Sequence, residues 1–154
     1  MNLNNLSKNS KKLIILASIL FFIFAFSLIF YLVDIKSSRR VFLFEGIDDG
    51  KVHLEIRYLP KVEKDIRVQQ YVEDLLLGPI HDRYRPLFSI GTTINSCFLR
   101  DKTLYIDLSK EAVLKTGIAS ETEKGVELLK LNITKNFSNI DNVILFMMGQ
   151  EVYK

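Results

Sequence analysis

The residue types that most often carry catalysis are scarce in this sequence of 154 residues, which has two histidines and one cysteine. His81 lies beside Asp82, and Ser109 follows a predicted strand. An enzyme that uses His81 as a base and Ser109 as a nucleophile is therefore one hypothesis. A nucleophile needs a base within hydrogen-bond reach, and no residue near Ser109 in the sequence supplies one. We instead expect Asp107 and Ser109 to turn the chain, and we expect no enzymatic activity.

Residues at the spacings needed for a metal or cofactor site are equally scarce. His53, His81 and Cys97 do not occur at the spacings of metal ligands. His53 falls on the polar face of a predicted strand, so we expect it on the surface. Cys97 lies within a strand, where a small buried residue is typical, and a single cysteine excludes an intramolecular disulfide. With no glycine-rich phosphate loop either, the sequence predicts no catalytic, cofactor-binding or metal-binding residues.

A binding site is better supported in the long predicted loop 80–92. Long loops in compact domains are often functional, and an aromatic ring beside a cation suits a sugar or an anionic polymer such as peptidoglycan. The alternative is that Leu87, Phe88 and Ile90 pack this loop onto the core as a lid. The candidate binding residues of the loop are Arg83, Tyr84, Arg85, Pro86 and Phe88.

The segment from Leu13 to Val33 predicts one transmembrane helix. It contains no charged residue, no Gly and no Pro, and as a helix it reaches about 31 Å, the thickness of a bilayer's hydrocarbon core. Ala25-Phe26-Ser27 is a small-x-small pattern, so a cleaved signal peptide is the alternative. Because the apolar run continues through Val33, we favour an uncleaved anchor. No Cys follows the segment closely, which argues against a lipidated N-terminus.

The charge distribution divides the chain at this segment. Lys8, Lys11 and Lys12 precede it, which leaves 18 of the 21 Lys and Arg residues to balance 18 Asp and Glu. The remaining domain is neutral, which argues against a nucleic-acid partner. The basic head favours a cytoplasmic N-terminus. We therefore predict a head at 1–12, a span at 13–33, a short linker at 34–40 and an extracytoplasmic domain at 41–154.

The domain shows alternating strand and helix patterns. Together they predict a small α+β domain with the order β-β-α-β-β-α-β, in which two helices pack on one mixed sheet. Strand 143–148 is apolar at both parities and is therefore expected to be buried on both faces. The predicted strands are 41–44, 52–59, 93–100, 103–108 and 143–148, and the predicted helices are 65–77 and about 121–137.

Local signals define the ends of these helices. Asp65 is expected to cap the first helix, and Gly78 to end it in a left-handed conformation. Ser120 and Glu123 have the spacing of a capping box for the second helix. In strand 52–59, we expect the apolar side chains Val52, Leu54, Ile56 and Tyr58 to face the core and His53, Glu55 and Arg57 to face water.

Five short motifs in this order resemble the GerMN domain, a family named for a protein of spore formation and germination. The resemblance covers about residues 41–152. Met148 stands where the family's closing turn usually has Asp, and Ser89 where a Pro often follows the Phe. The motifs are Tyr58-Leu59-Pro60, Leu75-Leu76-x-Gly78-Pro79, Pro86-Leu87-Phe88-x-x-Gly91-Thr92, Leu104-Tyr105-Ile106-Asp107-Leu108-Ser109 and Met148-Gly149-Gln150-Glu151-Val152.

The resemblance implies a non-enzymatic module outside a bacterial cytoplasmic membrane, similar to ring-building motifs that assemble envelope proteins. On this basis we expect a single-pass protein with its N-terminus inside, held in membrane lipid by Leu13–Val33. Its domain would dock an envelope protein or self-associate. The alternative from the residues themselves is a module that binds peptidoglycan or a small ligand through loop 80–92.

Overall fold

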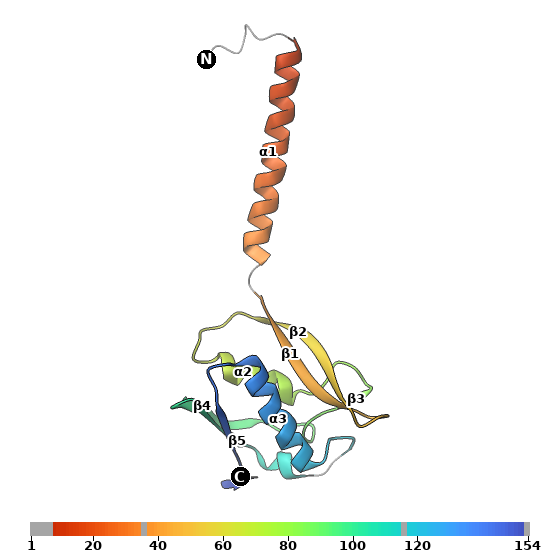
Figure 1. Cartoon of the computed structure of the whole chain (residues 1–154), viewed down its shortest axis with the longest axis vertical. Helices are drawn as coiled ribbons and strands as arrows, with labels where there is room; N and C mark the ends of the chain where they lie inside the picture. The colour runs from red at the N-terminus through yellow and green to blue at the C-terminus, as the bar shows by residue number, and fades with distance from the viewer. Residues whose placement is uncertain (1–7, 35–36, 115–116, 153–154) are drawn as a thin grey trace. The chain divides into compact units, whose positions relative to one another are not determined.

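The computed structural model describes residues 8–34, 37–114 and 117–152 and divides the chain into two compact units, Met1–Ser37 and Ser38–Lys154. The first unit contains helix α1, Lys8–Asp34 (Figure 1). Within α1, the segment Ser10–Leu32 is long and apolar enough to cross a membrane, with a mean hydropathy of 3.0. This segment includes nearly all of the predicted span at 13–33.

The second unit confirms the predicted α+β class and the order of the main elements. Two short strands, β3 and β7, are additions to that order, and β1 begins at Ser37, inside the predicted linker. The elements are β1 Ser37–Gly46, β2 Val52–Pro60, α2 Arg67–Leu76, β3 Tyr84–Arg85, β4 Ile94–Arg100, β5 Thr103–Leu108, the 3₁₀ helix η2 Lys110–Val113, α3 Thr122–Asn136, β6 Asn142–Met147 and β7 Gln150–Val152.

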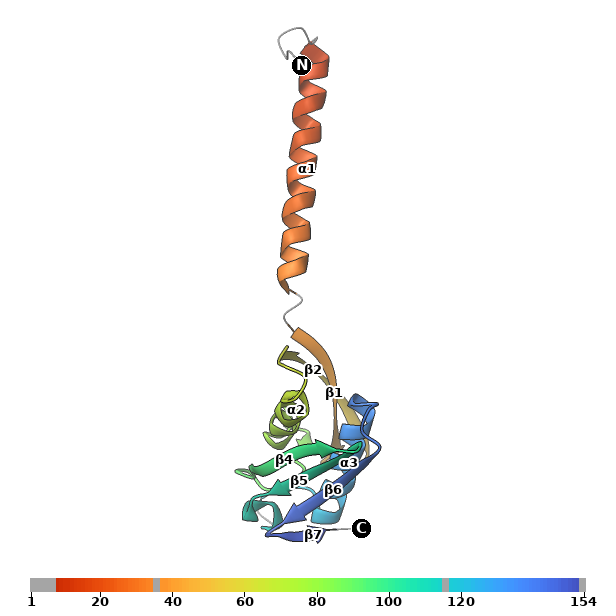
Figure 2. The ribbon, with the colours of Figure 1, turned by 90° about the vertical axis from the view of Figure 1, so that its left-hand side faces the viewer.

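The strands form two sheets rather than the one expected. A three-stranded sheet has the order β2-β1-β3, and a four-stranded sheet has the order β4-β5-β6-β7. The second is the mixed sheet: β5 and β6 run parallel, whereas β4 and β7 pair antiparallel with their neighbours. Figure 2 shows these four strands side by side, with α3 behind them. β3 pairs with the far end of β1 and completes the sheet of the first hairpin.

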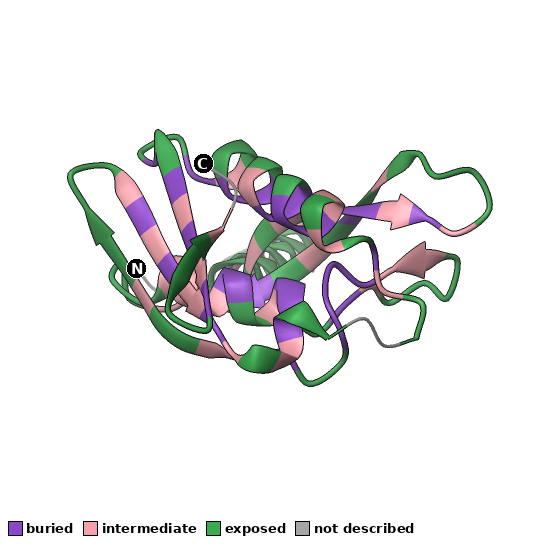
Figure 3. Ribbon diagram, turned by 90° about the horizontal axis from the view of Figure 1, so that it is seen from below, coloured by how far each residue is buried: buried purple, intermediate pink, exposed green. Residues whose placement is uncertain are grey.

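The core lies on one face of the four-stranded sheet. Helix α3 packs against β6 and α2 against β4, and buried and less buried residues alternate along the strands (Figure 3). On β6, Ile144 and Phe146 face away from the core and are only half-buried, so the expectation that both faces are buried was wrong. The inward-facing residues of β5 and β6 are Leu104, Ile106, Leu108, Val143, Leu145 and Met147.

The predicted helix caps are not formed, although the predicted helix end is. Helix α2 has Ile66 at its N-cap position, so Asp65 does not cap it, and no side chain bonds there. Helix α3 begins after Glu121, and the hydroxyl of Ser120 donates instead to Glu45 Oε2 at 2.8 Å, which removes the expected capping box. Gly78 has φ +90°, as predicted for the residue that ends α2.

Strand β2 has the opposite orientation to the one expected. Its polar side chains Glu55 and Arg57 face the protein, and their side chains are only 4% and 9% exposed. Its apolar side chains face outward, with 44% exposure for Val52, 52% for Leu54, 43% for Ile56 and 68% for Tyr58.

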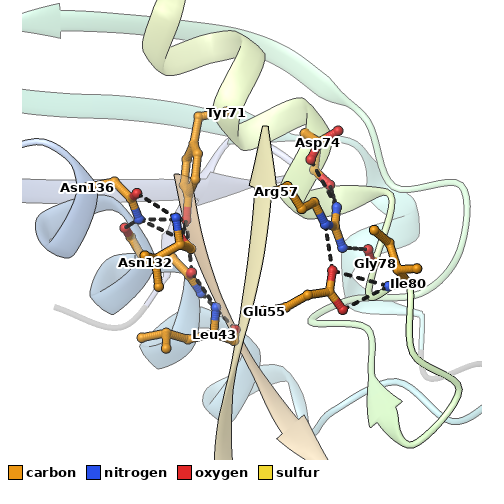
Figure 4. A network of polar contacts seen from close by, with 10 residues as sticks. Leu43, Glu55, Arg57, Tyr71, Asp74, Gly78, Ile80, Asn132 and Asn136 are labelled. Carbon is orange, nitrogen blue, oxygen red and sulfur yellow. Dashed lines mark hydrogen bonds and ion pairs between the residues drawn. The ribbon is translucent and has the colours of Figure 1, made fainter. Parts of the chain in front are cut away.

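The inward charges of β2 are satisfied by the C-terminal end of α2 (Figure 4). Arg57 donates to Glu55 Oε1 at 2.6 Å, to Asp74 Oδ2 at 2.9 Å and to the carbonyl of Gly78 at 2.6 Å. Its guanidinium carbon lies 4.5 Å from the centre of the Phe42 ring. Because every charge finds a partner, burial of the polar face is tolerated. This network joins the first hairpin to α2.

Two asparagines of α3 bind the backbone of β1 as a neighbouring strand would (Figure 4). Asn132 Oδ1 accepts from the Leu43 N–H at 2.8 Å, and Asn132 Nδ2 donates to the Leu43 carbonyl at 2.9 Å. Asn136 makes the same pair of bonds with Val41, at 3.1 and 2.7 Å. The hydroxyl of Tyr71 donates to the Val41 carbonyl at 2.7 Å. These bonds fix α3 against the three-stranded sheet.

Candidate functional site

The structure divides the five candidate residues of loop 80–92 between surface and core. Arg83 is exposed, and Tyr84 and Arg85 are half-buried in the short strand β3. Pro86 and Phe88 are buried, although Phe88 still lines a cavity of about 290 Å³ together with Arg85. The lid interpretation is correct for Leu87 and Phe88. It is wrong for Ile90, which is 87% exposed.

Tyr84 is the centre of an aromatic cluster that contains both histidines of the chain. The His53 ring stacks on Tyr84 with centroids 5.1 Å apart and an interplanar angle of 14°. The His81 ring meets Tyr84 edge-on, with centroids 5.7 Å apart. Because β3 pairs with the end of β1 at Glu45 and Gly46, the loop is brought beside the β1–β2 turn. We call Tyr84, His53 and His81 the Tyr84 cluster.

Asp49 fixes the orientation of His53 in this cluster. His53 Nε2 lies 3.1 Å from both carboxylate oxygens of Asp49, and the Lys51 N–H donates to Asp49 Oδ1 at 3.0 Å. The Lys51 N–H and His53 together lower the pKa of Asp49 below its usual range. Gly46 makes room for the pair, because a Cβ there would lie 2.3 Å from Asp49 Oδ1.

Sequence reasoning missed the role of His53. We expected it on the surface, and its side chain is 38% exposed, but the stacking of its ring on Tyr84 was not predicted. The contact depends on pairing between β1 and β3, which are far apart in the sequence, and no local pattern reports that pairing. The presence of Gly46 and Asp49 in the preceding turn was the one available signal.

Neither catalysis at Ser109 nor metal binding is supported by the arrangement of side chains. Ser109 Oγ accepts from the Thr93 N–H at 3.1 Å, and Asp107 Oδ2 accepts from Asn95 at 3.1 Å, so both are engaged by the neighbouring strand. The structure places both histidines at Tyr84, not at Ser109. Among the residues that the structure describes, no group of three or more His, Cys, Asp and Glu side chains could hold a metal ion.

A second candidate surface is the outer face of β2, which we call the β2 stripe and define as Val52, Leu54, Ile56 and Tyr58. All four side chains are exposed, and β2 is the edge strand of its sheet. Edge strands of monomeric proteins usually carry charges that prevent pairing with another chain. Here the charged residues of the strand face the protein, and a contiguous apolar row faces outward. Such a row is typical of a contact surface.

Comparisons with known proteins identify relatives of the second unit. Residues 40–153 match the model of the Germane family, described as sporulation and spore germination. An uncharacterized lipoprotein of Treponema pallidum (strain Nichols) is 30% identical over 83 residues, 54% of this chain and 62% of that protein. The chain therefore spans less than two thirds of that relative's length.

Two solved structures have a similar fold. The first GerMN domain of the sporulation protein GerM from Bacillus subtilis is 27% identical with a TM-score of 0.60, covering 75% of this chain and 86% of that domain. The tandem GerMN domains of the same protein give the same identity and TM-score, and there the match covers 41% of that chain. The similarity thus extends over one domain of that tandem pair.

Proposed function

Because this chain belongs to the Germane (GerMN) family of sporulation and spore germination domains, we propose that it is a membrane-anchored, non-catalytic interaction module of the bacterial cell envelope. In this proposal α1 is a single-pass anchor with its N-terminus in the cytoplasm, and residues 38–154 lie outside the cytoplasm. The apolar segment Ser10–Leu32 supports the anchor. A relative named as a lipoprotein is consistent with an envelope location.

The observation that carries the proposal is the β2 stripe. Between the stripe residues lie Glu55 and Arg57, which face inward. The stripe therefore cannot turn inward without breaking the bonds of Arg57 to Glu55, Asp74 and Gly78. Four exposed apolar side chains in a row on an edge strand favour pairing with another protein. The partner in this proposal is an envelope protein or a second copy of the chain.

Co-purification from solubilised membranes tests this function. The full chain carrying Leu54→Lys and Ile56→Lys should lose a protein partner, or its own dimer, that the wild-type chain retains. Because both side chains are exposed, the double variant should remain folded. Leu77→Lys is the matched control, since Leu77 is 82% exposed but lies outside the stripe. An identical set of partners for wild type, double variant and control would contradict the proposal.

The Tyr84 cluster favours a second candidate function, binding of peptidoglycan or a small ligand. A stacked aromatic pair beside the exposed cation Arg83 is suited to a sugar ring with an anionic group. Arg85 is less available, because its Nη1 donates to the Ile118 carbonyl at 3.5 Å. Sedimentation with purified peptidoglycan tests this function: Tyr84→Ala with Arg83→Gln should abolish binding. Undiminished binding by that variant, or none by the wild type, would exclude the loop as a sugar site.

A further inference from the structure

A cavity of about 710 Å³ lies between the start of α2, β4 and the end of α3. Its apolar lining includes Val68, Leu104 and Phe137, and its polar lining includes Lys64 and Arg67. An apolar floor with cations at one side matches a ligand that is anionic at one end and apolar at the other. The volume is that of a site for a small organic group.

Arg40 of β1 does not line the cavity itself, but it contacts Phe137, which does. Its guanidinium carbon lies 4.8 Å from the centre of the Phe137 ring, and its Nη1 donates to the Asn136 carbonyl at 3.1 Å. Partial burial and the positive charge of Arg67 lower the pKa of Arg40. Phe137 thus connects Arg40 to the cavity that Lys64 and Arg67 line. We call Arg40, Lys64 and Arg67 the Arg40 patch.

The charges of the Arg40 patch are not balanced within the protein. In the described part of the chain, none of the three side chains has a carboxylate within 4.0 Å. Asp65 also lines the cavity, so the two lining cations Lys64 and Arg67 stand against one carboxylate there, and Arg40 adds a third positive charge from beside Phe137. Like charges held together without counterions destabilise each other, and a bound anion removes that repulsion.

The position of Arg40 in the chain limits where this patch can lie. Helix α1 ends at Asp34, and Arg40 is the sixth residue after it. Six residues span at most about 20 Å when fully extended. If α1 is a membrane anchor, as the proposed function requires, Arg40 cannot be far from the phosphate groups at the bilayer surface.

We propose that the Arg40 patch and its cavity bind the phosphate group of an anionic phospholipid from the membrane that holds α1. The cations contact the phosphate, and the apolar part of the lipid next to it lies on the floor formed by Val68, Leu104 and Phe137. This lipid site rests on the proposed function, because only an anchored chain keeps the patch at the membrane surface. It orients the domain on the bilayer and leaves the β2 stripe for a protein partner.

Fluorescence quenching in vesicles tests the lipid site with the full chain. The sequence contains no Trp, so Phe98→Trp places a single reporter in the lining of the cavity. Vesicles contain phosphatidylglycerol or phosphatidylcholine with brominated acyl chains, which quench only Trp residues close to them. We expect strong quenching by brominated phosphatidylglycerol and weak quenching by brominated phosphatidylcholine. Equal quenching by the two lipids would overturn the proposal.

A pair of charge variants tests whether the Arg40 patch causes the quenching by brominated phosphatidylglycerol. Lys64→Gln with Arg67→Gln should weaken docking about 30-fold, because each cation near an anionic surface contributes about a factor of five. The matched control is Lys51→Gln with Lys110→Gln, which removes the same charge from exposed positions elsewhere and should leave quenching unchanged. Equal losses in the two pairs would reduce the effect to net charge and contradict a site.

Two further measurements distinguish a failure of the lipid site from a failure of the proposed membrane anchor. Millimolar inorganic phosphate should not reverse the quenching; reversal would show that the cations bind phosphate equally well without the apolar part of a lipid, which contradicts a lipid site. Alkaline carbonate washing should leave the chain in the vesicles. A chain that is washed off contradicts the anchor, and with it the proposed function. A chain that stays in the vesicles with an unquenched reporter contradicts the lipid site alone.

Discussion

Asn132 and Asn136 stabilise β1 where it has no neighbouring strand on that side. Each amide offers one donor and one acceptor at the spacing of a peptide group, and the two residues are one helical turn apart on α3. They can therefore bond two backbone positions of β1 that are two residues apart, Val41 and Leu43. Buried backbone groups without such partners would cost stability.

Replacement of Asn132 should strongly destabilise the domain. Asn132 is fully buried, and Asn132→Ala leaves the N–H and carbonyl of Leu43 without partners. We expect a loss of about 2–4 kcal/mol in the free energy of unfolding. Urea denaturation of residues 38–154 measures it. Asn142→Ala, at an exposed position, is the control and should change stability by less than about 0.5 kcal/mol; equal effects would contradict the structural role.

Cys97 should be an unreactive thiol at neutral pH. Burial, and secondarily the negative charge of Glu73, raises its pKa from 9.0 to about 11. A raised pKa keeps the thiol protonated, so at pH 8 its thiolate fraction, and hence its alkylation rate, should be roughly 100-fold below that of an ordinary cysteine. Iodoacetamide labelling across pH 7–10 measures the rate. Ser96→Cys with Cys97→Ser supplies an exposed reference thiol on the same strand; equal rates would contradict the raised pKa.

Helix α3 approaches loop 80–92 so closely that one position of the helix must be glycine. A Cβ at Gly125 would lie 2.3 Å from the carbonyl oxygen of Leu87. Alanine is intrinsically better than glycine inside a helix by about 1 kcal/mol. The close contact outweighs that preference, because the backbone of the loop would have to move.

Gly125→Ala should therefore destabilise the domain despite the gain in helix propensity. We expect a net loss of about 1–3 kcal/mol in the free energy of unfolding, as in other overpacked sites. Thermal and urea denaturation provide the measurement, with Thr134→Ala at an exposed position of the same helix as the control. A more stable Gly125→Ala variant would show that the loop does not lie against α3 as described.

The turn between β6 and β7 contains a residue that fits it poorly. Met148 has φ +54° and Gly149 has φ +75°, and two positive φ values in a two-residue hairpin favour Asn-Gly or Asp-Gly. Met148 also departs from the GerMN pattern, in which this turn usually has Asp. Met148 is 67% exposed, so its side chain adds little packing in compensation.

Met148→Asn should therefore stabilise the domain. Asn tolerates the left-handed conformation, and we expect a gain of about 0.5–1 kcal/mol in the free energy of unfolding. The midpoint of urea denaturation should rise without a change in slope. Met147→Asn is the opposite control, since Met147 is buried and should lose stability. A lower midpoint for Met148→Asn would contradict the turn geometry.

The strands and helices were largely predictable from the sequence, but the orientation of β2 was not. Period-two alternation assigns residues to the two faces of a strand, but it does not determine which face is exposed to solvent. The usual assumption that apolar residues face inward fails here because Arg57 and Glu55 find partners on α2. Those partners come from a later element, so local sequence carries no sign of them. The division into two sheets was missed for the same reason.

For the whole molecule, the candidate site was predictable only in part. Composition favoured loop 80–92 as a candidate binding site, but it could not separate exposed Arg83 from buried Phe88, because that distinction depends on packing against α3. An anchored domain meets its partners in a thin layer near the membrane, which raises their effective concentration. A weak contact surface such as the β2 stripe is sufficient under that condition.

A photo-crosslinking scan along β2 in cells tests most directly whether the outer face of this strand binds a protein. A photoreactive amino acid is placed at each position from Val52 to Tyr58 in turn. The structure predicts strong adducts at 52, 54, 56 and 58, whose side chains face outward, and none at 55 and 57, whose side chains are only 4% and 9% exposed. Adducts at 55 and 57, or none at any position, would contradict this account.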